Sequence, residues 1–172
     1  VNLDETGPSW KGIMPDSHDA LHDTVRYECL WGTLLAGGAG VEWYFGYRYP
    51  HNDLNCEDFR SRENWWKQSA LATKFMLGFP LEEMKSNNAL VDVKGSFCLE
   101  KPEEIYVVYL PAGAKNARIE IPGGKQFGLS WFNPRKGGEL VKGTISGIQG
   151  KGKQSIGSPP AETDKDWVVV VR

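Results

Sequence analysis

The sequence lacks a long apolar run, an excess of basic residues and a dense set of cysteines. No segment contains the roughly 20 consecutive apolar residues that a membrane-spanning helix needs, so no membrane span is expected. The formal net charge is −2, and Lys and Arg are scattered apart from the stretch GKGKQ, which argues against a nucleic-acid partner. The charged, turn-rich N-terminus is not typical of a secretion signal. Either the chain is not exported, or an export signal lies upstream of Val1.

The three cysteines, Cys29, Cys56 and Cys98, include no CxxC pair and allow at most one disulfide. They leave both the disulfide state and the redox compartment open. The 172 residues are 40% hydrophobic and 24% charged, which is typical of one globular domain or two small ones.

The first half of the chain alternates between strand and helix patterns. We predict strands at residues 1–5 and 41–47, and helices at about 19–36 and 57–77, with Asn55 as a plausible N-cap of the second helix. This βα alternation is typical of a parallel sheet. Two parallel strands are normally part of a larger covered sheet, so we expect partner strands from the upstream chain or from another subunit.

After residue 86 the hydrophobic pattern changes to the period of two that β-strands show. Short segments of this kind, separated by Gly, Pro and Asn turns, predict an antiparallel β-sandwich. Phe127, Leu129 and Trp131 are expected to point inward, and residues 147–164 are expected to form a long exposed loop. The predicted strands are ALVDVKGSFCLE, EIYVVYLP, ARIEIP, FGLSWF, GELVKGTI and DWVVVVR.

Four stretches resemble a bacterial protein family: VNLDETGP, RYECLWGTLLAGGAGVEWYFGY, SRENWWKQ and YVVYLPAG…LSWFNPRKGG. These proteins join a glycoside-hydrolase-like (β/α)8 barrel to a C-terminal sandwich that carries the name of a collagen-binding domain. The resemblance implies an α+β fold in which residues 1–85 are the end of a TIM barrel, with strands 7 and 8, and residues 86–172 are the sandwich. The other six barrel strands would lie outside this sequence.

The resemblance also gives Glu5 a candidate role. Barrel enzymes carry their chemistry at the C-terminal ends of the strands, and the acid that ends strand 7 is typically the nucleophile in retaining glycosidases of this architecture. The partner acid would belong to strand 4, so this chain is not expected to hydrolyse glycans alone. Asp4 should point to the opposite face from Glu5. The alternative is that both acids are solvated or cap the Gly-Pro turn.

Aromatic residues gather near the same predicted strand ends. Trp10, Trp43 and Tyr47 are candidate sugar contacts, because flat aromatic faces stack on the C–H surfaces of sugars. Strand alternation places Tyr44 on the face opposite Trp43, and packing in a core is the favoured interpretation for Tyr44 and Phe45.

Four polar residues fall in the two loops on the same rim. Asp53 is a candidate substrate-binding residue, and Asp16, His18 and Asn52 accompany it. Such residues can bind sugar hydroxyls or simply cap the following helices, and helix capping is the commoner role of Asp and Asn.

The stretch HDALHD suggests a competing hypothesis. His18 and His22 are four residues apart, and on a helix they would share a face as in the HExxH motif of zinc peptidases. Asp19 is shorter than the glutamate of that motif, and no spacing marks a third ligand. We therefore expect no metal and no cofactor, and interpret the stretch as a polar helix start.

The predicted sandwich leaves its own role open. Arg135, in the turn after Trp131, could pair with an acid, contact the barrel or meet a ligand.

The resemblance leads us to expect that the chain is part of a secreted, extracellular or periplasmic glycoside hydrolase that acts on a glycan. The alternative is an extracellular collagen- or matrix-binding protein without catalytic activity. The sugar, the linkage, the stereochemical outcome and the oligomeric state remain open.

Overall fold

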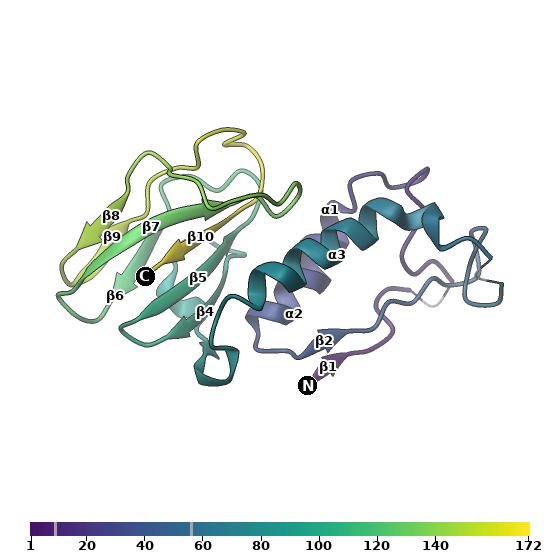
Figure 1. Cartoon of the computed structure of the whole chain (residues 1–172), viewed down its shortest axis with the longest axis horizontal. Coiled ribbons are helices and arrows are strands. Elements are labelled where there is room, and N and C mark those ends of the chain that lie inside the picture. Colours follow the sequence, from purple (N-terminus) through teal and green to yellow (C-terminus); the bar gives the residue numbers. More distant parts are fainter. Residues whose placement is uncertain (9, 56) are drawn as a thin grey trace. The chain divides into compact units, whose positions relative to one another are not determined.

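The computed structural model describes residues 1–8, 10–55 and 57–172 (Figure 1). Strand β1 (Asn2–Leu3) pairs in parallel with β2 (Gly40–Val41), with Asn2 opposite Gly40 and Leu3 opposite Val41. The predicted parallel pairing is therefore confirmed. Both strands are shorter than expected, since the segment after Val41 leaves the sheet to contact the loop that follows β1.

The segment between β1 and β2 is helical over a shorter range than the sequence predicts. Helix α1 (Asp23–Val25), a π-helical segment (Arg26–Trp31) and α2 (Gly32–Leu35) follow one another without a break. The helix begins at Asp23 rather than near residue 19, because His22 adopts a left-handed backbone conformation with φ of 50°. Such a residue cannot continue a right-handed helix.

The second predicted helix is confirmed with a different start. A 3-10 turn (Phe59–Arg62) leads into α3 (Glu63–Met76). Asp58 is the N-cap of the turn, and its side chain accepts a hydrogen bond from the backbone N–H of Arg60 at 3.0 Å. The prediction of Asn55 as the cap was wrong: its side chain accepts from the backbone N–H of Asn52 instead.

The rest of the chain is built from antiparallel sheets, and the predicted mixed α+β class is confirmed at that level. One sheet has the strand order β3-β4-β5-β10-β7-β8, and a separate pair joins β6 to β9. Two short 3-10 turns (Leu81–Glu83 and Asn88–Leu90) flank β3. The strands are β3 (Lys85–Ser86), β4 (Phe97–Lys101), β5 (Ile105–Leu110), β6 (Arg118–Ile121), β7 (Gln126–Phe132), β8 (Gly147–Gln149), β9 (Gly152–Ser155) and β10 (Trp167–Val171).

The core of this region takes residues from both sheets. Ile119 on β6 packs in the same buried cluster as Val108 and Val169 of the six-stranded sheet. The inward direction predicted for β7 is confirmed, since Phe127, Leu129 and Trp131 are at most 4% exposed.

Two strand predictions in this region were wrong. Residues 138–145 form no strand, and only Val141 makes an isolated bridge to Trp131. Residues 147–164, expected to be a loop, contain β8 and β9. Gly150 and Gly152 have φ of 119° and 89°, which lets the chain turn tightly between these two strands.

Tertiary contacts divide the chain into two compact units. The N-terminal unit comprises Val1–Leu34 and Gly38–Gly78, and the C-terminal unit comprises Leu35–Gly37 and Phe79–Arg172. Within the described residues, no helix is both long and apolar enough to cross a bilayer.

Candidate functional site

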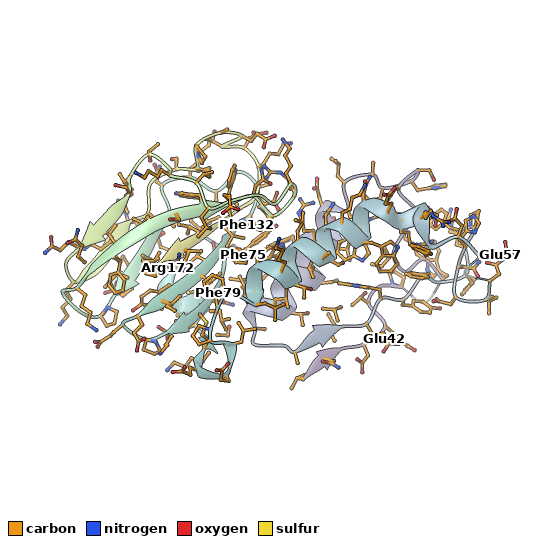
Figure 2. All side chains as sticks on the ribbon, in the orientation of Figure 1. Glu42, Glu57, Phe75, Phe79, Phe132 and Arg172 are labelled. Atoms are coloured by element: carbon orange, nitrogen blue, oxygen red, sulfur yellow. The ribbon has the colours of Figure 1, made fainter. Side chains whose placement is uncertain are left out.

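The loops that follow β1 and β2 are joined by backbone hydrogen bonds. The N–H of Ile13 donates to the carbonyl of Tyr44 at 2.7 Å, and the N–H of Arg48 donates to the carbonyl of Trp10 at 3.0 Å. Glu42 and Glu57, labelled in Figure 2, lie near the two ends of the second loop. Because both loops leave the C-terminal ends of parallel strands, they form one continuous rim.

Glu5 lies two residues after the end of β1 and is exposed. Its φ of 49° is in the left-handed region, which few residues other than glycine adopt, so the backbone turns sharply at this carboxylate. Strained backbone of this kind occurs often at binding and catalytic sites. The feature marks Glu5 as a candidate without assigning its role.

Tyr44, in the second loop, is affected electrostatically by Glu5 of the first loop. Burial raises the pKa of the Tyr44 phenol above its ordinary value. The negative charges of Asp53 and Glu5 raise this pKa further, and electrostatic interaction with Tyr47 acts in the same direction. The two acids and Tyr47 therefore act electrostatically on Tyr44. Tyr44 therefore keeps its proton and can donate a hydrogen bond.

Sequence reasoning missed Tyr44, because the strand alternation applied to residues 41–47 is not present. β2 ends at Val41, so the side chains that follow do not alternate between two faces. Trp43 is partly buried and packs edge-on against Trp65, with ring centres 4.6 Å apart. Phe45 packs against Trp66 at 5.6 Å, as expected of a core residue.

Asp53 holds the second loop in shape. Its carboxylate accepts a hydrogen bond from the N–H of Phe45 at 3.0 Å, and its own N–H donates to the carbonyl of Gly46 at 3.2 Å. Asn52 is buried and donates from its side chain to the carbonyls of Tyr47 and Tyr49. Both residues organise the loop, and Asp53 remains exposed at the rim.

Aromatic and cationic side chains line the rim beside these acids. Trp10 is 39% exposed and Tyr47 is 59% exposed. The guanidinium carbon of Arg48 lies 4.8 Å from the centre of the Trp10 ring and 5.7 Å from that of Tyr49. His18 contacts the other aromatic partner, Tyr49, with ring centres 4.5 Å apart.

His22 is fully buried and belongs to a polar network rather than to a histidine pair. Its Nε2 lies 2.8 Å from Asp16 Oδ1, and Asp16 Oδ2 accepts from the N–H of Asn64 at 2.9 Å. Because the helix starts after His22, His18 and His22 do not share a helix face. Across the described ranges, no group of three or more His, Cys, Asp or Glu is arranged to hold a metal ion.

A pocket of about 200 Å³ lies between the loop after β1 and the helical segment. Thr6 Oγ1 and His22 Nδ1 belong to residues lining it, and both atoms are buried without a hydrogen-bond partner in the described part of the chain. Cys29 lines it too, and burial, with the charge of Glu28, raises the pKa of its thiol. Lys11 and Asp19 are further lining residues.

The disulfide question is answered for two of the three cysteines. Cys29 and Cys98 are free thiols. Burial and the neighbouring Glu100 raise the pKa of Cys98 to about 12. Cys56 lies outside the described residues.

In the C-terminal unit, Arg135 pairs with acids, which was one of the three alternatives. Its guanidinium lies 2.9 Å from Asp166 Oδ1 and 2.8 Å from Glu162 Oε2. The hydrogen bond from Lys136 contributes most to lowering the pKa of Glu162, and the hydrogen bond from Arg135 contributes next. The guanidinium also lies over the ring of Trp167, at 5.6 Å from its centre. This network ties the turn after β7 to the segment that precedes β10.

Residues 93–172 match a sequence family described as "Putative collagen-binding domain of a collagenase". This match lies within the C-terminal unit. A comparison with curated proteins found no match.

Two solved structures are similar to nearly the whole chain. One is described as a glycoside hydrolase and the other as a glycoside hydrolase family 5 protein from Bacteroides vulgatus ATCC 8482. Each has a TM-score of 0.63 and 15% sequence identity over 98% of this chain. The chain spans 38% and 41% of their respective lengths, about two fifths. At this identity the likeness concerns the fold, and the similarity to glycoside hydrolases is structural.

Proposed function

We propose that the chain is part of a glycoside hydrolase that acts on a polysaccharide or glycan outside the cytoplasm. In this proposal the N-terminal unit supplies the last two βα units of a (β/α)8 barrel, and the C-terminal unit is an accessory β-sandwich. The observation that carries the proposal is the position of Glu5. It follows a parallel strand and shares the neighbourhood of Tyr44 with Asp53 from the next βα loop.

The proposed chemistry assigns Glu5 the role of nucleophile in a retaining mechanism. Its carboxylate would attack the anomeric carbon while an acid from another part of the barrel protonates the leaving oxygen, and water would then hydrolyse the glycosyl-enzyme. Tyr44, which keeps its proton, would donate a hydrogen bond to the substrate or to Glu5. Tyr47 and Trp10 would contact the sugar face, and Asp53 its hydroxyl groups. Trp43 would support this rim through Trp65.

The experiment that tests the proposal measures hydrolysis of a glycan panel by the natural polypeptide. Glu5→Gln should lower kcat by about 100-fold or more, because the amide cannot serve as a nucleophile or exchange protons. Asp4→Asn is the matched control: it removes the adjacent exposed carboxylate and should leave turnover unchanged. Equal turnover in the Glu5→Gln variant would contradict the assignment.

A second candidate function is supported by the family match over residues 93–172. In this alternative the protein binds collagen or another matrix ligand through the C-terminal unit and has no catalytic role. The test is the binding of the folded chain to immobilised triple-helical collagen and to glycans. Saturable binding to collagen that Glu5→Gln leaves intact would favour this alternative, and a folded chain that binds neither would count against it.

A further inference from the structure

We infer that Arg48 forms a subsite for an anionic group on a sugar ligand, either the carboxylate of a uronic acid or a sulfate ester. Arg48 is exposed on the rim, with its guanidinium carbon near the rings of both Trp10 and Tyr49. Within the part of the chain that the structure describes, no carboxylate pairs with it. The inference rests on the proposed function for the sugar part of the ligand.

The two aromatic contacts hold this side chain in place. A guanidinium that stacks on aromatic faces keeps the N–H groups at its edge available, and that edge matches a carboxylate or sulfate with two parallel hydrogen bonds. The main chain is fixed as well, because the N–H of Arg48 donates to the carbonyl of Trp10. Less side-chain freedom is therefore lost when an anion binds.

Arg60, in the 3-10 turn that follows the second loop, provides a comparison. Its guanidinium carbon also lies over an aromatic ring, 5.1 Å from the centre of Phe59. Unlike Arg48, it already has an anionic partner, because its Nη1 lies 3.2 Å from Asp58 Oδ1. The two arginines thus share exposure and ring contact, and they differ in whether a carboxylate is present.

The charges of the rim make Arg48 the group on which the binding of an anionic ligand would depend. Glu5 and Asp53 are both exposed, and both act on Tyr44, so they make this neighbourhood unfavourable for an anionic ligand. A cation is required if an acidic sugar is to bind there. Arg48 can supply that cation. It lies three residues after Phe45, whose N–H donates a hydrogen bond to Asp53. A neutral sugar would make no use of its charge.

The test compares three sets of oligosaccharides of equal length: neutral, uronate-containing and sulfated. Binding to the intact chain is measured by calorimetry, without turnover. An anionic set should bind about 10-fold or more tightly than the neutral set, since a hydrogen bond to a charged group is worth more than a neutral one, and the preference should shrink with added salt. Arg48→Gln should remove the preference, so that the anionic sets bind no more tightly than the neutral set.

Two variants complete the design. Arg60→Gln should keep the preference, and Arg48→Lys should keep part of it, because the charge remains while the two-pronged geometry is lost. Tighter binding of uronates alone or of sulfates alone identifies the source of the anion. Equal binding of all three sets, no binding of either anionic set, or a preference that survives Arg48→Gln overturns the inference. Because no step depends on Glu5, these results are independent of the outcome for hydrolysis.

Discussion

The two units of the molecule are stabilised in different ways. In the C-terminal unit, side chains that alternate along antiparallel strands fill one apolar cluster. In the N-terminal unit, charged and amide side chains occupy buried positions and reach backbone carbonyls. Arg26 Nη1 donates to the carbonyl of Leu21 at 2.8 Å and to the amide of Gln68 at 3.1 Å. Among the residues of this unit that the structure describes, the buried polar side chains are Thr6, His22, Arg26, Asn52, Arg62 and Gln68.

Arg62 shows what the polar interior of the N-terminal unit does. Its side chain is fully buried, its Nε donates to the carbonyl of Ile13 at 2.6 Å, and its Nη1 donates to the carbonyl of His51 at 2.8 Å. One side chain at the start of α3 therefore fixes both rim loops. The core of the C-terminal unit is specified mainly by hydrophobic pattern, with Glu100 and Asp166 as buried charged exceptions. The rim of the N-terminal unit is specified by a few directional hydrogen bonds.

The largest expected effect concerns the apolar cluster. Trp131→Ala should lower the free energy of unfolding of the C-terminal unit by about 3–5 kcal/mol, because it leaves a large cavity in a close-packed core. Hydrogen–deuterium exchange, read separately from peptides of each unit, is the measurement. Lys165→Ala, at an exposed position of the same unit, is the control. A loss below about 1 kcal/mol would contradict the packing described for this tryptophan.

The matching change in the N-terminal unit is Arg62→Met. It preserves much of the side-chain volume but removes the donors to the buried carbonyl of Ile13 and the partly buried carbonyl of His51, and should cost about 1.5–3 kcal/mol. Exchange should increase first in peptides containing Ile13 and His51. Arg60→Met, at an exposed site two residues earlier, should change little. If Arg62→Met and Arg60→Met lower the free energy of unfolding equally, the buried hydrogen bonds of Arg62 do not stabilise the N-terminal unit as described.

The third prediction concerns pH and the network around Arg135. The folded-state pKa of Glu162 lies below its ordinary value of 4.5, so its ion pairs stabilise the fold above that pH and the stabilisation is lost as the pH falls through the lowered pKa. Glu162→Gln should therefore reduce stability at neutral pH slightly and flatten its dependence on pH in the acid range. Denaturant unfolding at several pH values measures this, with the exposed Glu139→Gln as control. An unchanged acid slope would contradict the ion pairs.

The smallest effect distinguishes the two free thiols. With a pKa of about 12 against an ordinary 9.0, Cys98 forms about a thousandfold less thiolate than a free cysteine. It should resist alkylation until the C-terminal unit unfolds, whereas Cys29 on the partly exposed helical segment should react earlier. Mass spectrometry of each labelled cysteine against time provides the measurement. Faster labelling of Cys98 would contradict its burial.

The sequence predicts elements whose pattern is local and misses those that depend on distant contacts. The parallel pairing of β1 with β2 follows from the βα alternation, and the inward face of β7 follows from its period of two. By contrast, β9 is a polar segment that is a strand only because it pairs with β6, from Arg118 opposite Ser155 to Ile121 opposite Gly152. The sequence predicts a loop for this segment instead, because its Gly- and Lys-rich composition is typical of loops.

The residues proposed for the candidate site can be named from the sequence, but their arrangement cannot. The position of Glu5 after a strand could be predicted, and its exposure agrees with that position. The packing of Trp43 on Trp65 and the effect of Glu5 and Asp53 on Tyr44 could not, because they depend on β2 ending at Val41. Nor could the left-handed backbone at His22, which delays the start of the predicted helix to Asp23, or the contact of its imidazole with Asp16.

The crossing of the two rim loops has a consequence for protein engineering. A Cβ on Gly12 would lie 2.2 Å from the carbonyl oxygen of Tyr44, and a Cβ on Gly46 would lie 2.8 Å from the backbone of Lys11. Each glycine therefore leaves room for the main chain of the opposite loop. A library that diversifies one loop, or a graft that transfers it to another scaffold, must therefore include both loops together.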